Sequence, residues 1–325
     1  MAEERSLYFI KAMYEGLRDA MREDETVVVI GEDVDRSIIG ATRGLIEEFG
    51  DERVKNTPIS EATFVGACVG AAAAGLRPVV DLMVGSFFYV SMDQVANQAA
   101  KLPYMSGGQV SLPIVYFTAS GPSGSAAAQH SENPHPMLMN VAGLKVVMPG
   151  SPRDAKGLMH AAIKDPNPVV YFQDAVLGGT KGPVPDEPYQ IPLGEAEVKR
   201  EGEDVTVVAI GALVNRALKV AEKLEGEGVS VEVVDPRTLV PLDRKTILDS
   251  VRKTGRAIVV HEAVSTLGMG SEVAARISEE CFYSLESPVM RVAGFDTPYP
   301  PSRIEEEYLP DLDRVLDAVD RSLAY

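Results

Sequence analysis

Short apolar runs that alternate with helical patterns constrain the fold of this chain most strongly. The runs in the first half are TVVVIGED, LRPVVDLMV, LPIVYFTAS and NPVVYFQD, and those in the second half are DVTVVAIG, VSVEVVD, RAIVVHE and VMRVAG. Between them, apolar residues recur at helical spacing, as in residues 213–225. Such strands are typical of mostly parallel sheets that helices cover on both faces. We therefore predict an α/β fold.

The length of the chain favours two domains, because 325 residues exceed what one ordinary core organises. A stretch rich in Pro, Gly and charge, residues 178–203, separates the two groups of strands. We predict a first domain over residues 1–185, a linker over 186–203 and a second domain over 204–325. Each domain should contain a mostly parallel sheet flanked by helices.

The net charge of −17 argues against nucleic acid as a partner, because binding to phosphates needs basic patches. Solubility is the favoured explanation of the charge, and docking onto a basic protein is the alternative. The two cysteines, Cys68 and Cys281, are far apart and suggest neither a disulfide framework nor a zinc site. The start of the chain has no apolar signal core, and no apolar run reaches ~18 residues. We expect a cytoplasmic protein, or one from a matrix-like compartment, that does not enter a membrane.

One carboxylate stands at the head of an apolar stretch, TPISEATFVGACVGAAAAGL, which covers residues 57–76. No charged residue follows Glu61 in this stretch. Helix N-termini favour acids, so Ser60 or Glu61 could simply cap the helix. An all-apolar helix should be buried, however, and its start then lies near the carboxyl ends of the strands, where α/β proteins bind ligands. We therefore consider Glu61 a candidate site residue.

Several segments resemble a known family. They are TPISEATFVGACVGAAAAGLRPVVDLM, DQVANQAAKLPYMSGG, AAAQHS, GLKVVMPGSPRDAKGLMHAAIKDPNPVV and GFDTPYPPSRIEEEYLPD. They resemble the beta subunit of the thiamine-diphosphate-dependent decarboxylase of 2-oxoacid dehydrogenase complexes, of the pyruvate or the branched-chain type. The resemblance implies a domain that binds the pyrimidine of the cofactor and a second, transketolase C-terminal-like domain.

The resemblance assigns roles around the cofactor. Glu61 would hydrogen-bond atom N1′ of the aminopyrimidine, and the resulting imine would remove the C2 proton of the thiazolium to give the carbanion that attacks a 2-oxo acid. Glu32 would be a second carboxylate beside Glu61, Phe87 would stack on the ring, and the backbone of Ile59 would lie near it. Without the resemblance, Glu32 is an ordinary acid at a strand end and Phe87 is a core aromatic next to Phe88.

His130 in AAAQHSEN matches the active-site histidine of the family. It would orient the substrate carboxylate or donate a proton when the acyl group moves to lipoamide. A histidine in a Gly- and Ser-rich loop is often only structural, and this alternative remains open. The loop SGPSGSAAAQHS nevertheless favours a functional role, because it is polar, has the composition of a flexible segment and is long for a connection between secondary-structure elements. We expect His135 and His261 to be structural.

A potassium site is a further implication of the resemblance. Its oxygen ligands would come from Ile114 and from AAIKDPNP, namely from Ala162, Ile163, Asp165 and Asn167. Turn formation by Asp-Pro-Asn-Pro explains the same string about as well.

A missing motif implies a partner. Members of the family hold the diphosphate through Mg²⁺ with a GDG motif and a later Asn, and this chain has no GDG. An alpha subunit should carry that half of the site in an alpha2beta2 heterotetramer, and a lipoyl-bearing acyltransferase should accept the acyl group. Three segments depart from the family pattern and leave the 2-oxo acid substrate and the acyl acceptor open, namely ENPHPMLMNVAG, HEAVSTLG and YFQD. Acetoin cleavage, another two-carbon transfer and a non-catalytic assembly role are the alternatives.

Overall fold

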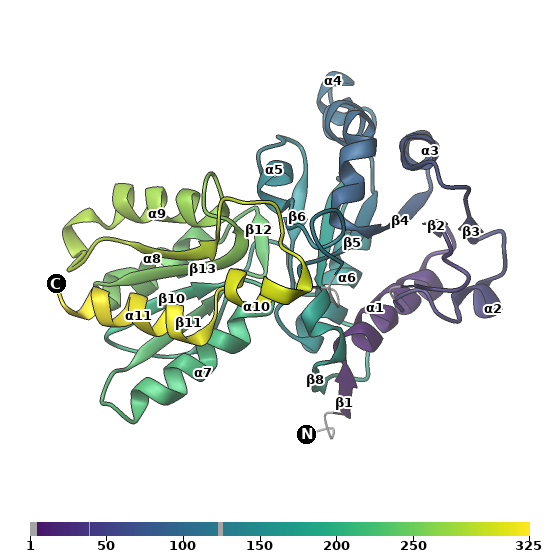
Figure 1. The fold of residues 1–325 in the computed structure, drawn as a ribbon. Helices are drawn as coiled ribbons and strands as arrows, with labels where there is room; N and C mark the ends of the chain where they lie inside the picture. The colour runs from purple at the N-terminus through teal and green to yellow at the C-terminus, as the bar shows by residue number, and fades with distance from the viewer. Residues whose placement is uncertain (1–4, 39, 123–125) are drawn as a thin grey trace. The chain divides into compact units, whose positions relative to one another are not determined.

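The computed structural model describes residues 5–38, 40–122 and 126–325. It forms two compact units, which Figure 1 shows as a ribbon. The first unit comprises Met1–Ser120 and Met137–Leu193, and the second comprises Gly121–Pro136 and Gly194–Tyr325. Residues 121–136 thus group with the second unit, although our predicted first domain included them. Their sequence carries no sign of this, because the grouping rests on contacts with residues more than a hundred positions away.

The first unit contains a parallel sheet whose strands follow the order β6, β7, β5, β4, β2, β3. The strands are β2 (Val27–Gly31), β3 (Val54–Asn56), β4 (Arg77–Val84), β5 (Val115–Ser120), β6 (Lys145–Val147) and β7 (Val169–Asp174). Every residue of β5 and β7 is buried, as expected for central strands covered on both faces. Parallel order places the carboxyl ends of all these strands at one edge of the sheet.

Helices and shorter helical turns surround this sheet. They are α1 (Phe9–Glu23), α2 (Leu45–Phe49), α3 (Glu61–Ala73), η1 (Gly85–Ser91), η2 (Asp93–Ala99), α4 (Leu102–Met105), α6 (Pro152–Lys164) and η3 (Ala175–Gly179). The boundary between the two units falls within α5 (His135–Met139). Ser151 caps α6: its hydroxyl accepts the N–H of Asp154 at 3.2 Å. Helices α1 and α6 pack closely because Gly16 has no side chain. A Cβ atom there would lie 2.5 Å from the carbonyl oxygen of Lys156.

Helix α3 is buried on one face only, so the expectation of a fully buried helix is wrong for the single chain. Its inner face consists of Phe64, Val65, Cys68, Val69 and Ala72. The opposite face exposes small residues: Thr63, Ala67, Gly70, Ala73 and Ala74. No heavy atom lies within 4 Å of a Cβ atom built at Gly70. An apolar helix therefore leaves a smooth stripe of small residues uncovered.

The second unit contains a sheet of order β14, β13, β10, β11, β9, in which only β9 is antiparallel to its neighbour. Its strands are β9 (Glu197–Arg200), β10 (Val205–Ala209), β11 (Val231–Asp235), β13 (Ala257–Val264) and β14 (Met290–Gly294). The remaining elements are α7 (Leu213–Glu225), β12 (Thr238–Val240), α8 (Arg244–Thr254), α9 (Met269–Glu280), η4 (Phe282–Ser284), η5 (Ser302–Ile304), α10 (Glu305–Tyr308) and α11 (Leu312–Leu323). The prediction of mostly parallel sheets flanked by helices is confirmed.

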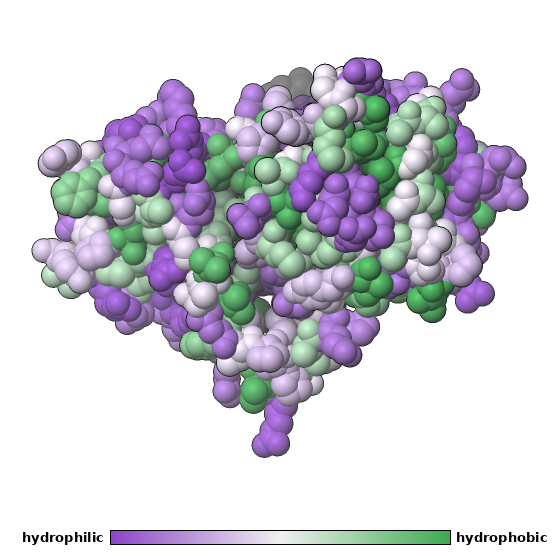
Figure 2. Space-filling model, turned by 90° about the horizontal axis from the view of Figure 1, so that it is seen from above, coloured by the Kyte–Doolittle hydropathy of each residue, from purple (hydrophilic) through white to green (hydrophobic). Residues whose placement is uncertain are grey.

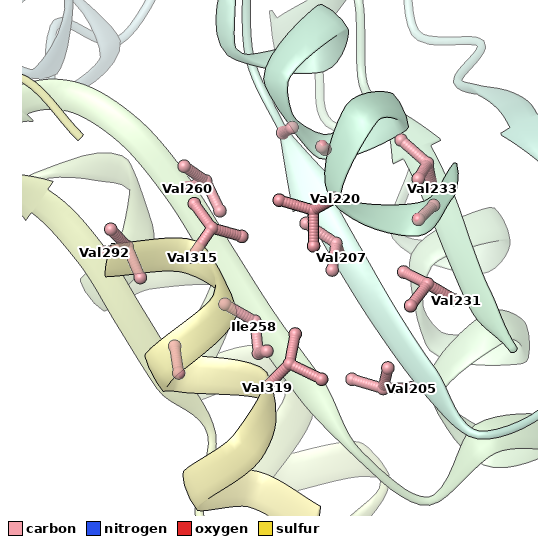
Figure 3. Close-up of a cluster of buried hydrophobic side chains, with 14 of the residues drawn as sticks. Val205, Val207, Val220, Val231, Val233, Ile258, Val260, Val292, Val315 and Val319 are labelled. Atoms are coloured by element: carbon pink, nitrogen blue, oxygen red, sulfur yellow. The ribbon is translucent and has the colours of Figure 1, made fainter. Parts of the chain in front are cut away.

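Alternation along β10 explains how helices cover both faces of the second sheet. Val205 and Val207 belong to an apolar cluster with Val220 of α7 and Val319 of α11, which Figure 3 shows in close-up. Thr206 points the other way, and its hydroxyl lies 2.7 Å from that of Ser250 in α8. Helices α7 and α11 therefore cover one face of the sheet and α8 covers the other.

Short strands with charged residues were not predicted. Strand β1 (Arg5–Tyr8) pairs antiparallel with β8 (Lys181–Val184) and directly precedes α1. Strand β9 lies within residues 186–203, our predicted linker. Such strands bury few side chains, so they carry no apolar run. They are held mainly by backbone pairing.

The surface mixes polar and apolar residues. Figure 2 shows hydrophilic and hydrophobic residues interspersed over the face seen from above. Among the described residues, no helix combines the length and the apolar character that crossing a bilayer requires.

Candidate active site

Two carboxylates meet at the carboxyl edge of the first sheet. Glu32 directly follows β2, and Glu61 begins α3 after the short strand β3. The N–H of Thr57 donates to the carbonyl of Gly31 at 3.0 Å and ties the intervening loop to the end of β2. Ser60 occupies the N-cap position, but its hydroxyl bonds that of Thr63 at 2.7 Å and makes no cap to the backbone. The structure thus places Glu61 in the first turn of the helix, half-buried, beside Glu32.

Glu32 lies in an environment that disfavours its charge. The residue is 6% exposed, and atom Oε1 has no hydrogen-bond partner among the described residues. Burial, followed by the negative charge of Glu61, raises the pKa of Glu32, and the backbone N–H of Ser60 offsets part of that rise. Glu32 therefore combines a buried carboxyl oxygen that lacks a partner among the described residues with a pKa above its usual range.

A third carboxyl group, Asp81, lies behind this pair, and the sequence analysis missed it. Asp81 is the register partner of Gly31 in the pairing of β4 with β2. Gly31 allows this approach, since a Cβ atom there would lie 3.0 Å from that of Asp81. Burial raises the pKa of Asp81 to about 7, and the charge of Glu32 adds to the rise. The signal was available: Asp81 is a lone acid inside the apolar run LRPVVDLMV.

The two neighbouring aromatic residues, Phe87 and Phe88, differ in burial. Phe88 is fully buried, and its ring centroid lies 6.2 Å from that of Tyr116 in an edge-to-face arrangement. Phe87, in η1, is only half-buried. Phe88 is therefore the core aromatic, whereas Phe87 keeps part of its surface accessible. Ile59 precedes the N-cap of α3 with 83% of its surface exposed.

His130 belongs to the second unit. The N–H groups of His130 and Ser131 donate to the carbonyl of Ala127 at 3.2 and 3.0 Å, which forms a turn. His130 is exposed in this turn. Residues 123–125 of the loop that we predicted to carry it lie outside the described residues.

The two other histidines of this unit are interior residues. His135 and His261 are each 1% exposed, and burial lowers their pKa values to about 3 and about 4. Both are neutral at physiological pH, in line with the structural role that we expected.

Comparison with known proteins identifies the family. The model described as "Transketolase, pyrimidine binding domain" matches residues 5–174, and "Transketolase, C-terminal domain" matches residues 194–315. The acetoin:2,6-dichlorophenolindophenol oxidoreductase subunit beta of Bacillus subtilis is 43% identical over 94% of both chains. The pyruvate dehydrogenase E1 component subunit beta of Leifsonia xyli is 43% identical over 99% of this chain and 96% of its own. The chain belongs to the transketolase-like family of 2-oxoacid dehydrogenase beta subunits.

Other relatives of this beta subunit extend the comparison. The 3-methyl-2-oxobutanoate dehydrogenase subunit beta of Mycobacterium tuberculosis is 42% identical over 98% of this chain and 92% of its own. Among solved structures, a split gene transketolase described as an inactive beta4 tetramer matches with a TM-score of 0.80 and 26% identity, and covers 98% of each chain. The resemblance inferred from the sequence motifs is confirmed, and the family is thiamine-diphosphate-dependent.

The residues predicted to bind potassium already have protein partners in this beta subunit. The carbonyl of Ile114 accepts the N–H of Val169 at 2.8 Å, and that of Ile163 accepts the Arg77 guanidinium at 2.9 Å. The carboxylate of Asp165 bonds Lys145 and also accepts the side-chain amide of Asn167, at 3.1 Å.

The carbonyl of Ala162 accepts the N–H of Asp165 at 3.3 Å. A potassium ion would need the second lone pairs of these carbonyl oxygens. The site stays a prediction, and no chemical step is derived from it.

Proposed function

We propose that this chain is the beta subunit of an acyl-transferring 2-oxoacid dehydrogenase, which decarboxylates a 2-oxo acid on thiamine diphosphate and passes the acyl group to lipoamide. The observation that carries the proposal is that Glu32, at the end of β2, lies near Glu61, at the start of α3, in a chain of this family. The pyruvate and the branched-chain relatives are about equally similar, so either 2-oxo acid fits.

The carboxylates fit the aminopyrimidine of the cofactor. Glu61 would hydrogen-bond N1′, and the unpartnered oxygen of Glu32 would hold or share the proton that this bond requires. The half-buried Phe87 would stack on the pyrimidine, and the backbone of Ile59 would lie beside it. When bound, thiamine diphosphate supplies the nucleophilic carbon and the electron sink for decarboxylation.

His130 would act on the substrate side of the reaction. An exposed imidazole can hydrogen-bond a substrate carboxylate or deliver a proton during acyl transfer. Its place in a turn bonded to Ala127, next to the buried Ser131, supports a defined position for the ring.

A partner subunit completes the proposal. The chain has no GDG motif, so an alpha subunit would hold Mg²⁺ and the diphosphate, in an alpha2beta2 heterotetramer. The uncovered stripe of small residues on α3 supports such an assembly, because it offers a close, smooth contact surface. A lipoyl-bearing acyltransferase would be the third partner.

Reconstitution tests the proposal. The chain would be mixed with a candidate alpha subunit that carries the GDG motif, thiamine diphosphate and Mg²⁺. CO2 release would be measured with pyruvate and with 3-methyl-2-oxobutanoate. We expect release with one or both. Acetoin cleavage is the second candidate, because the acetoin-linked relative matches at 43% identity. Turnover of acetoin with a dye acceptor, and of neither 2-oxo acid, would favour it and contradict our proposal.

A further inference from the structure

The segment that carries His130 is held by a buried side-chain hydrogen bond. Atom Nδ2 of Asn133 donates to Oε2 of Glu262 at 3.1 Å, and both atoms belong to the second unit. Asn133 is 8% exposed and Glu262 is 6% exposed. A hydrogen bond between groups that are so little exposed is stronger than the same bond at the surface, because the local dielectric constant is lower.

Glu262 itself has a fixed place near the end of β13. A Cβ atom built at Gly294 of β14 would lie 2.5 Å from the carbonyl oxygen of Glu262, so the two strands pack tightly there. Burial, followed by the negative charge of Glu262, raises the pKa of Tyr308 to about 12. Arg314, which donates to the carbonyl of Tyr308 at 3.2 Å, partly offsets that rise. The carboxylate is thus part of the framework of the unit.

The chain between this anchor and His130 is too short to move independently. Ser131 is fully buried, and its N–H donates to the carbonyl of Ala127 at 3.0 Å. Three residues span at most about 10 Å, so Asn133 and the Ser131 turn bond bracket the backbone of His130. On the far side of Asn133, the buried His135 lies near His261 of β13.

We propose that Glu262 is a positioning residue for His130, which acts by holding Asn133 and thereby the turn that presents the imidazole. The inference rests on the proposed function for the role of His130, but the placement of the turn does not depend on that role. Glu262 would touch neither substrate nor cofactor.

Hydrogen exchange of the full-length chain tests the placement. We expect Glu262→Ala to increase exchange in peptides covering residues 126–136 roughly 10- to 100-fold, the equilibrium equivalent of one hydrogen bond to a charged group. Peptides from the first unit should not change, which controls for folding. Glu262→Gln keeps an oxygen that can accept from Asn133, so exchange should stay close to that of the wild type. Unchanged exchange in Glu262→Ala would overturn the proposal.

A double-mutant cycle and kinetics test the mechanism. If the two substitutions remove the same hydrogen bond, the double variant Asn133→Ala/Glu262→Ala should show no faster hydrogen exchange in residues 126–136 than either single variant. Additive increases in exchange would count against a shared contact. In the reconstituted enzyme, Glu262→Ala should lower kcat of acyl transfer roughly 10- to 100-fold, with cofactor affinity unchanged and activity restored in Glu262→Gln.

These experiments distinguish the positioning role of Glu262 from the proposed role of His130 in the reaction. Faster exchange in Glu262→Ala, together with no kinetic effect of His130→Ala, would keep the positioning and contradict the proposed role of His130. A loss of acyl transfer in His130→Ala but not in Glu262→Ala would contradict the positioning alone.

Discussion

Glu61, at the first position of α3, lies close enough to Glu32, at the end of β2, that its negative charge adds to the rise in the Glu32 pKa that burial causes. The two carboxylates come from different elements and meet because parallel strands end at the same edge of the sheet. Glu32 is buried, and its atom Oε1 has no hydrogen-bond partner among the described residues. Burial and the nearby negative charge both favour the protonated form of Glu32.

The first prediction concerns Glu61→Gln. The substitution preserves size, so we expect an intact fold, but CO2 release by the reconstituted enzyme should be lost, because an amide cannot exchange a proton with the cofactor. Removing the charge should also lower the pKa of Glu32, since burial then acts without Glu61. Glu47→Gln, an exposed acid in the first turn of α2, is the matched control. Near-normal turnover in Glu61→Gln would contradict the assignment.

The second prediction concerns Asp81→Asn and stability. The rise of the Asp81 pKa from 3.8 to about 7 corresponds to about 4 kcal/mol of unfolding free energy at full ionisation. Because the pKa of Asp81 is higher in the folded state, Asp81 ionises at lower pH in the unfolded state. The resulting loss of unfolding free energy grows from pH ~4 to ~7. Asparagine keeps an oxygen that can accept the N–H of Met83.

We therefore expect Asp81→Asn to be more stable than the wild type, with a larger advantage at pH 8 than at pH 5. Urea unfolding at the two pH values measures the difference. A stability difference that does not change with pH would show that Asp81 carries no such penalty.

The third prediction is that the purified chain alone decarboxylates nothing, with thiamine diphosphate and Mg²⁺ present. The sequence lacks the motif that holds the metal and the diphosphate. CO2 release from labelled 2-oxo acid is the measurement, and addition of the alpha subunit is the positive control. Cofactor-dependent release without a second subunit would refute the division of the site between two chains.

The fourth prediction separates two roles of His130. If it donates a proton during acyl transfer, His130→Ala should lower reductive acylation of a lipoyl domain by roughly 10²–10⁴-fold, as loss of a general acid does. Decarboxylation measured with an artificial electron acceptor should fall less. Equal losses in both assays with a raised KM would instead indicate binding of the substrate carboxylate. No loss in either assay would leave His130 as a structural histidine.

Local patterns determined much of this protein. Helix α7 matches the range expected from spacing, and α6 begins at Pro152 directly after its cap Ser151, an order typical of helix starts. Helix α3 begins at Glu61, as the apolar stretch indicated. These features depend on neighbours within one or two turns, so the sequence contains the whole signal. The family motifs are local in the same sense.

Only the tertiary structure decided which distant groups meet. The proximity of Asp81 to Glu32 depends on the register of β4 with β2, and the bond from Asn133 to Glu262 joins segments far apart in the chain. The exposed face of α3 and the pairing of β1 with β8 are also long-range outcomes. Burial and electrostatic environment are properties of the packed chain. The sequence by itself could therefore name Glu61 and His130 as candidates, whereas their surroundings followed from the fold.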